Sequence, residues 1–253
     1  MSILKVEGLR KTYGNRYKKQ EVLKGLDFEI DKGEFVTIMG PSGSGKTTLL
    51  NVISSIDYIT SGIVEVNGNQ INKMSNRQLA NFRKREVGFI FQDYSVLHTL
   101  TVKENIMLPL SIQKMSKSEK EKSYKEVTEA LGIDELGAKY PNQISGGQQQ
   151  RTAAARASVH KPAIIFADEP TGALDSKSAQ DLLKRLQDMN KNMNSTIVMV
   201  SHDPVAASYS NRVIMLKDGN IHSEIRQGDD TNQEFYKNII HMQTALGGAA
   251  NEL

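Results

Sequence analysis

The feature that most constrains this chain is GPSGSGKT at residues 40–47, because of what stands on either side of it. An apolar run, EFVTIM, precedes it, and GKTTLLNVISSI continues from it with the composition of a helix. A strand, a glycine-rich loop and a helix in this order form a P-loop, whose backbone N–H groups and positive helix N-terminus surround phosphates. Lys46 is expected to reach the β- and γ-phosphates, and the Thr47 hydroxyl to bind Mg²⁺. The chain is therefore predicted to bind a nucleoside triphosphate on an α/β core.

Composition limits the remaining possibilities. The chain has 253 residues, enough for one large domain or two joined lobes, and no apolar run approaches the length of a membrane-spanning helix. The start, MSILKVEGLR, begins with strand-like alternation and has no signal peptide, so we expect a cytoplasmic chain that needs a partner for any membrane role. The absence of cysteine excludes disulfides and thiolate zinc sites. A net charge of +3 is too small to indicate nucleic-acid binding.

Periodicity predicts two kinds of strand. Residues 3–13 and 22–31 alternate apolar and polar side chains, as half-buried antiparallel strands do. Short apolar runs indicate buried strands, and an Asp-Gly pair between two alternating runs near the C-terminus indicates a hairpin. These further strands are expected at residues 61–68, 87–92, 163–168 and 195–200, with the hairpin at 212–225 and a crossover helix at 175–191.

The stretch from about 93 to 160 has helical character. Thr101 with Glu104, and Ser118 with Glu121, have the spacing of capping boxes, so these glutamates are predicted to be structural. The tail from about residue 228 is predicted to be a helix that packs back on the body rather than a partner-binding face. Its apolar residues recur at helical spacing: Phe235, Ile239, Met242 and Leu246. The result is an α/β core with a helical lobe inserted between its two halves.

Two carboxylates follow a buried strand downstream of the P-loop. Asp168 ends the run IIFAD, where it would emerge at the carboxyl edge of the sheet and supply a second Mg²⁺ ligand. Glu169 follows directly and is the natural base to orient and polarise a water molecule. An Asp-Glu pair alone is more often part of a solvated loop, but its position after IIFA favours the functional interpretation.

Two other polar residues occupy equivalent edge positions. His202 follows TIVMVS, where its imidazole would contact the γ-phosphate and sense hydrolysis, and Gln92 follows VGFIF, where its amide would touch Mg²⁺ or the water. An isolated histidine is usually a surface or satisfied core residue. We interpret the remaining histidines in that way: His98, His160, His222 and His241.

The pentapeptide ISGGQ at residues 144–148 is harder to explain within one chain. Ser145 and two glycines open the helix QQQRTAAARAS, which makes either a plain N-cap or a second anion site. About 100 residues separate it from the P-loop, and an inserted lobe would hold it far away. A second phosphate-binding helix end makes sense if it completes the nucleotide site of another copy of the protein.

Taken in order over residues 40–203, these motifs resemble the ATP-binding subunits of ABC transporters. The combination of SGGQ with a P-loop is specific to that superfamily, and the likeness covers nearly the whole chain. It implies a P-loop NTPase core with a RecA-like mixed sheet, an antiparallel β subdomain and an inserted helical subdomain. The expected cassette is residues 1–226, with core lobes 1–92 and 160–226 and a helical lobe at about 93–159. The expected C-terminal tail is residues 227–253.

The resemblance also implies roles for individual residues. Two cassettes pair head to tail, so that ATP and Mg²⁺ are clamped between the P-loop of one copy and the signature SGGQ of the other. Catalytic roles fall to Glu169, His202 and Gln92, and metal-binding roles to Thr47, Gln92 and Asp168. Nucleotide-binding roles fall to Tyr13, which would stack on adenine, and to Gly40, Pro41, Ser42, Gly43, Ser44, Gly45, Lys46, Thr47, Thr48, Ser145, Gly146, Gly147, Gln148 and the D-loop residue Asp175. The departures are mild: isoleucine replaces leucine before SGGQ, and GALD replaces SALD.

Finer features resemble one branch of the superfamily. ADEPTGALDSK and SHDPVAASY are similar to the branch of macrolide export, lipoprotein release and peptide-antibiotic resistance. GALDSK, the insertion NRYKKQ at residues 15–20 and the LGG tail most resemble the Bce-type, bacitracin-resistance ATPases. That likeness implies a homodimer at the cytoplasmic face of the membrane, an integral-membrane permease, and a sensor histidine kinase reached through the permease. The segment Asp93–Leu100 is a candidate for the permease contact, or else an ordinary exposed loop.

Two alternatives stay open on the sequence. One is a soluble ABC ATPase without a permease, such as an assembly or repair factor. The other is an ATPase whose main role is to report drug flux to the sensor kinase. Co-purification with a membrane protein would distinguish the first, and separate measurement of resistance and of sensor activation would distinguish the second.

Overall fold

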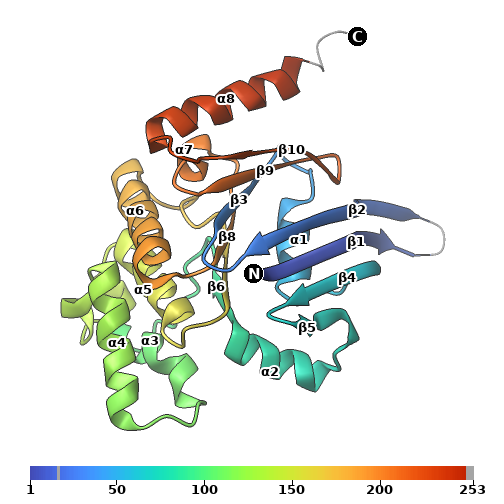
Figure 1. The fold of residues 1–253 in the computed structure, drawn as a ribbon. Coiled ribbons are helices and arrows are strands. Elements are labelled where there is room, and N and C mark those ends of the chain that lie inside the picture. Colours follow the sequence, from blue (N-terminus) through green and yellow to red (C-terminus); the bar gives the residue numbers. More distant parts are fainter. Residues whose placement is uncertain (16–17, 249–253) are drawn as a thin grey trace.

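Two β-sheets form the framework of the chain in a computed structural model that describes residues 1–15 and 18–248 (Figure 1). In spatial order, the larger sheet consists of β10 (Asn220–Arg226), β9 (Arg212–Lys217), β3 (Phe35–Met39), β8 (Ile197–Val200), β7 (Ile164–Asp168) and β6 (Val87–Ile90). The smaller sheet consists of β2 (Lys19–Asp31), β1 (Ser2–Gly14), β4 (Ser61–Val66) and β5 (Asn69–Gln70). The predicted mixed sheet and antiparallel sheet are both confirmed.

The larger sheet brings the motif residues to one edge. Strands β9, β3, β8, β7 and β6 run parallel, and β10 pairs antiparallel with β9. Residues of β3 and β8 are completely buried, as expected for strands covered on both faces. Because parallel strands share the direction of their carboxyl ends, the segments after β3, β7 and β8 meet at the same edge. These segments are the P-loop, Glu169 and His202.

Helices cover the faces of this framework and connect its strands. Their bounds are α1 (Lys46–Ile53), α2 (Asn76–Glu86), α3 (Val102–Ser111), α4 (Lys117–Leu131), α5 (Gly146–Ser158), α6 (Ser176–Met193), α7 (Pro204–Ala207) and α8 (Asn232–Gly248).

The two faces of the larger sheet have different cover. Helix α1 and the smaller sheet pack on one face, where Val36 and Ile38 of β3 join their apolar core. Helices α3, α4 and α5 pack on one another and reach α6 on the opposite face (Figure 1). In the described part of the chain, no helix is long and apolar enough to cross a membrane.

Helix α8 confirms that the tail packs back on the body. Phe235 and Ile239 are completely buried against Met39 at the end of β3, Ala207 in α7, and the strand β9. Met242 is half-buried beside them. The side chain of Leu246 and residues 249–253 lie outside the described residues, as do residues 16–17 of the predicted insertion.

The helix starts include one error of prediction and one omission. Thr101 and Glu104 form the expected capping box at α3, but Ser118 and Glu121 do not cap α4. Ser116 does so with Glu119, because α4 already begins at Lys117 and places Ser118 inside its first turn. Glu121 instead pairs with Lys103, at 2.9 Å. Helix α2 was not predicted, although Ser75 and Gln78 have the capping-box spacing that would have indicated its start.

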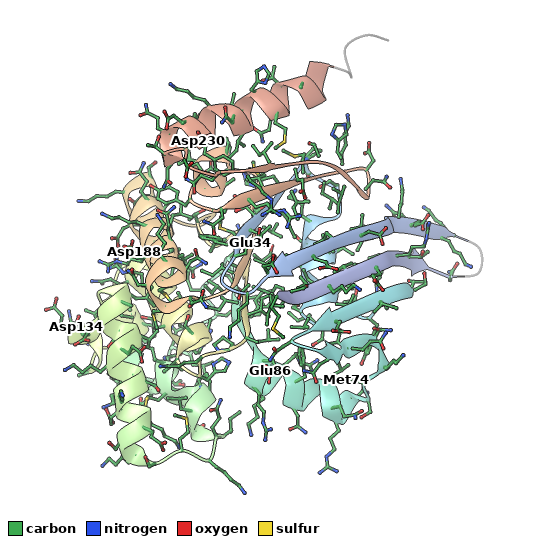
Figure 2. The ribbon with its side chains drawn as sticks, in the orientation of Figure 1. Glu34, Met74, Glu86, Asp134, Asp188 and Asp230 are labelled. Carbon is green, nitrogen blue, oxygen red and sulfur yellow. The ribbon has the colours of Figure 1, made fainter. Side chains whose placement is uncertain are left out.

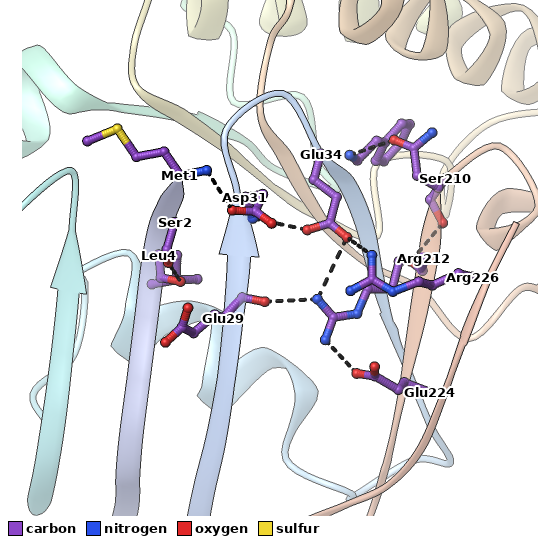
Figure 3. A network of polar contacts seen from close by, with 12 residues as sticks. Met1, Ser2, Leu4, Glu29, Asp31, Glu34, Ser210, Arg212, Glu224 and Arg226 are labelled. Atoms are coloured by element: carbon purple, nitrogen blue, oxygen red, sulfur yellow. Dashed lines mark hydrogen bonds and ion pairs between the residues drawn. The ribbon is translucent and has the colours of Figure 1, made fainter. Parts of the chain in front are cut away.

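A buried ionic network joins the two sheets at the edge away from the P-loop. Figure 2 places Glu34 in the middle of the molecule, between the strands. Its carboxylate accepts a hydrogen bond from the backbone of Asp31 at 3.0 Å and pairs with Arg226 at 3.1 Å (Figure 3). The guanidinium of Arg212 lies 3.7 Å from the same carboxylate, pairs with Glu224 and donates to the carbonyl oxygen of Glu29 at 2.8 Å. These contacts connect β2, β9 and β10 to Glu34, the residue directly before β3.

Candidate nucleotide-binding and hydrolysis site

The P-loop lies between β3 and α1, and its shape depends on glycine. At Gly40 an added Cβ atom would lie 2.1 Å from the carbonyl oxygen of Leu216. Gly45 caps α1 with a φ of 102°, in the region that favours glycine. Lys46 donates hydrogen bonds of 2.9 Å to the carbonyl oxygens of Gly40 and Pro41, so its ammonium group lies inside the loop. Burial lowers the pKa of Lys46, and the nearby charges of Glu169 and Asp168 oppose this shift.

The turn between β9 and β10 supports the loop from outside. The backbone N–H of Gly219 donates to the carbonyl oxygen of Ser44 at 3.2 Å, and the carbonyl oxygen of Gly219 accepts from the N–H of Lys24 at 2.9 Å. The Asp-Gly pair predicted the turn itself. Its contact with the P-loop was not predicted, because the partners are about 175 residues apart and carry no shared local pattern.

A cavity of about 760 Å³ opens at this edge. Its lining includes most of the P-loop, the predicted base and the predicted switch histidine. The prediction that these segments meet at one edge of the sheet is therefore confirmed. The lining also includes residues of β2 and of the β9–β10 turn that were not predicted. The lining residues are Gln20, Glu21, Val22, Lys24, Ser42, Gly43, Gly45, Lys46, Thr47, Thr48, Glu169, His202, Asp218 and Gly219.

Glu169 and His202 contact each other at the mouth of this cavity. The imidazole Nδ1 of His202 lies 3.1 Å from Oε1 of Glu169, and the histidine side chain is 68% exposed. Glu169 has a φ of 42°, an uncommon left-handed conformation for a residue with a side chain. Its backbone N–H donates to the carbonyl oxygen of Val200 at 3.0 Å, which fixes the backbone of Glu169 relative to β8. Strained backbone held by surrounding structure is typical of functional sites.

Asp168 has the chemistry of a metal ligand. Its Oδ1 is buried and has no hydrogen-bond partner among the described residues, while the side chain of Thr47 lies close enough to lower the pKa of the carboxylate. Burial, followed by the charge of Glu169, raises the pKa of Asp168. In the described part of the chain, no three His, Asp or Glu side chains gather as a metal site. Mg²⁺ suits this arrangement, because it is usually held by one or two protein oxygens together with substrate phosphates and water.

Gln92 lies beside the loop that follows Glu169. Its Nε2 is only 2.9 Å from the position that a Cβ atom would take at Gly172. A residue that was not predicted connects the two loops: Gln150 of α5 is completely buried, and its amide donates to the carbonyl oxygens of Phe91 at 2.9 Å and Pro170 at 2.6 Å. Gln150 stands in a run of three glutamines, and nothing in the sequence distinguishes it from its neighbours.

The signature segment lies apart from this cavity. Ser145 is an exposed N-cap of α5, with its hydroxyl accepting from the N–H of Gln148 at 3.3 Å. Gly147 permits α5 to approach α6, since a Cβ atom there would lie 2.9 Å from the side chain of Ser178. Asp175 caps α6 by accepting from the N–H of Ser178 at 3.0 Å. Within the described residues, the lining of the cavity includes none of residues 145–148 or Asp175.

Tyr13, predicted to stack on adenine, lies at the end of β1 and is 42% exposed. Its hydroxyl donates to Asp57 at 2.7 Å, and the side chain of Thr48, which lines the cavity, lies close enough to oppose the rise in the pKa of Tyr13. Burial, with the contact to Asp57, raises the pKa of Tyr13. The aromatic ring therefore stands next to the cavity wall formed by the start of α1.

Comparisons with known proteins agree with this geometry. The sequence profile described as "ABC transporter" matches residues 23–172. The chain is 56% identical to the bacitracin export ATP-binding protein BceA of Halalkalibacterium halodurans over the full length of both. It is 42% identical to the lipoprotein-releasing system ATP-binding protein LolD of Cytophaga hutchinsonii, over 86% of this chain and 97% of that one. The ATP-binding cassette MJ0796, solved as a dimer in a post-hydrolysis state with ADP and Pi, superimposes with a TM-score of 0.78 at 39% identity, over 88% of this chain and 98% of that one.

Proposed function

The chain belongs to the ABC transporter family as an ATP-hydrolysing subunit, and from this premise we propose that two copies close on two Mg-ATP and drive a membrane permease. The observation that carries the proposal is the meeting of Lys46, Glu169 and His202 in one cavity that excludes the signature segment. A site whose phosphate loop is complete, but whose second anion-binding helix end lies elsewhere, is completed by a second copy. The dimeric form of the similar cassette MJ0796 supports this arrangement.

We propose the following roles for the residues of the site. Glu169 orients and polarises the attacking water. His202 is hydrogen-bonded to the carboxylate of Glu169, holds it in place and contacts the γ-phosphate. Lys46 exchanges its two carbonyl partners for phosphate oxygens, and Thr47 and Asp168 hold Mg²⁺. When bound, Mg²⁺ neutralises charge on the phosphates. The amide of Gln92 touches Mg²⁺ or the attacking water from the neighbouring loop. Ser145 to Gln148 and Asp175 contact the nucleotide held by the other copy.

The proposed cassette spans residues 1–226, with the helical lobe at about 93–159, and the tail spans residues 227–253. The chain works at the cytoplasmic face of the membrane through its permease. Segment Asp93–Leu100 is the proposed permease contact, supported by the exposure of Leu97, which is 48% accessible, between the two lobes. The full-length similarity to BceA supports a role in bacitracin or related peptide-antibiotic resistance, with a sensor histidine kinase addressed through the permease.

The test is the variant Glu169→Gln. It should retain ATP binding, lose turnover by about two orders of magnitude or more, and accumulate as a closed dimer in the presence of Mg-ATP. Size-exclusion chromatography and phosphate release measure the two effects. Lys46→Ala serves as the comparison, because it should lose tight nucleotide binding and should not accumulate as a closed homodimer. Near wild-type turnover in the glutamine variant would overturn the assignment of the base.

A second measurement addresses the cellular role. Cells that carry Glu169→Gln should lose resistance to bacitracin, and the activity of the sensor pathway should be recorded in the same strain. Loss of resistance with intact sensor activation would favour transport as the main role, whereas loss of sensor activation alone would favour signalling.

A further inference from the structure

The ring of Tyr13 is held at two points by residues with no assigned role. Its hydroxyl donates to Oδ2 of Asp57 at 2.7 Å. The ammonium group of Lys11 lies 4.6 Å from the ring centroid, in the geometry of a cation–π contact. Lys11 and Tyr13 are two residues apart on β1, so their side chains leave the same face of the strand. One face of the ring is therefore occupied by a cation, while the side chain as a whole stays 42% exposed.

Lys11 is itself fixed in place. It is only 7% exposed, an unusual position for a lysine, and its Nζ donates to Oδ1 of Asp57 at 2.8 Å and to the carbonyl oxygen of Tyr58 at 2.6 Å. Partial burial would raise the pKa of Asp57, but the bonds from Lys11, Tyr13 and the backbone of Tyr58 outweigh it and hold the pKa low. The three side chains thus form one network around an ionised carboxylate.

The network is anchored to the helix that begins at the P-loop. The N–H of Asp57 donates to the carbonyl oxygen of Asn51 in α1 at 3.0 Å. The segment that follows is bound to β1, because the N–H of Thr12 donates to the hydroxyl of Thr60 at 2.9 Å. At the other end of α1, the side chain of Thr48 lies near the hydroxyl of Tyr13. The position of the ring is thereby set relative to the same helix whose N-terminus faces the phosphates.

We propose that Lys11 and Asp57 are positioning residues that hold Tyr13 ready to receive the base of the nucleotide. The inference rests on the proposed function, in which Tyr13 stacks on adenine. The ammonium group covers one face of the ring and leaves the other face for the base. Because the ring is fixed before binding, less side-chain freedom is lost when the base arrives. A base-selective contribution to affinity then comes from two residues that touch no nucleotide atom.

The experiment compares two ligands of the full chain, Mg-ATP and inorganic tripolyphosphate with Mg²⁺, by calorimetry. Tripolyphosphate has phosphates but no base, so it reports on the P-loop alone. Lys11→Met and Asp57→Ala should raise the Kd for ATP about three- to tenfold and leave the Kd for tripolyphosphate unchanged. The kcat at saturating ATP should stay near the wild-type value while KM rises. Lys11→Arg, which keeps the cation, should restore most of the ATP affinity.

Lys5→Met is the matched control, because Lys5 lies on the same strand and pairs with Glu7 at 2.7 Å on an exposed surface away from Tyr13. It should change the Kd for neither Mg-ATP nor tripolyphosphate. Asp57→Asn provides a milder change if Asp57→Ala folds poorly. Equal weakening of both ligands would show that the network only supports the P-loop, and unchanged affinity for both would show that it has no role; either result overturns the inference.

The reference variant is Tyr13→Ala. It should raise the Kd for ATP about tenfold or more and leave the Kd for tripolyphosphate unchanged. In its background, Asp57→Ala should have no further effect on ATP. If Tyr13→Ala leaves ATP affinity unchanged, the stacking role in the proposed function fails. If Tyr13→Ala weakens ATP but Lys11→Met and Asp57→Ala do not, the stacking role stands and the positioning role fails.

Discussion

Asp168, the proposed Mg²⁺ ligand, illustrates how a residue suited to metal binding opposes the stability of its own fold. Burial and the charge of Glu169 raise its pKa above the ordinary value, so its contribution to stability is complete at pH values below the unfolded-state pKa and is lost as pH rises through the folded-state pKa. At neutral pH the ionised carboxylate, with one oxygen lacking a partner among the described residues, therefore destabilises the nucleotide-free protein.

We predict that Asp168→Asn raises the stability of the nucleotide-free chain at neutral pH by about 1 kcal/mol, because it removes a buried charge while keeping the shape. Thermal unfolding over a pH series measures this, and the gain should shrink as the wild-type carboxyl becomes protonated in acid. The same variant should lose the additional stabilisation that Mg-ATP gives to the wild type. An asparagine variant less stable than wild type at pH 7 would contradict the argument.

At the scale of elements, the network around Glu34 holds the β9–β10 hairpin against β2 and β3. Glu34 is 10% exposed and Arg212 only 8%, whereas Arg226 is 61% exposed. Loss of Glu34 removes one buried partner of Arg212, which keeps Glu224 and the carbonyl oxygen of Glu29, and it also removes the acceptor for the backbone N–H of Asp31; exposed pairs contribute little. Since the same hairpin donates a backbone hydrogen bond to the P-loop, its anchoring also bears on the site.

Glu34→Ala should therefore reduce the free energy of unfolding by about 2 kcal/mol, roughly 4–8 °C in Tm. Arg226→Ala, which removes the exposed partner of the same carboxylate, should change it by less than about 1 kcal/mol. Differential scanning calorimetry of both variants decides the point. Equal losses would show that the buried Arg212 pair is no more important than the exposed one.

Whether a feature could be predicted from the sequence depends on how far apart its interacting residues are in the chain. The strands, the P-loop helix and the tail helix come from patterns within one segment, and each was found. The start of α4 was misplaced by two residues because two capping-box spacings overlap at Ser116 and Ser118. The contact of Gly219 with Ser44, the linking role of Gln150 and the bond between Tyr13 and Asp57 join distant segments, and no local pattern carries them.

For the whole molecule, the proposed composite site predicts complementation between two inactive chains. Lys46→Ala disables a P-loop, and Ser145→Arg disables a signature segment. In a mixed dimer both defects fall in one site, and the other site is intact. An equimolar mixture should recover about a quarter of the wild-type ATPase rate if the chains pair at random and the sites act independently, since half of the dimers are then mixed and each has one working site of two.

The matched control is a mixture of Lys46→Ala with Glu169→Gln. Both defects belong to the P-loop side of the site, so each site of the mixed dimer keeps one defect and no activity should return. Phosphate release measures both mixtures. Recovery in the control as well, or in neither mixture, would count against a site that is shared between a P-loop and a signature from different copies.

Gln150 links two loops of the site to one helix. Its single buried amide holds the backbone behind Gln92 and the backbone after Glu169 at the same time, and it belongs to the helix that Ser145 begins. A rotation of α5 therefore displaces both loops together. A substitution at this one position therefore reaches the Gln92 loop, the loop after Glu169 and the helix of the signature segment at once.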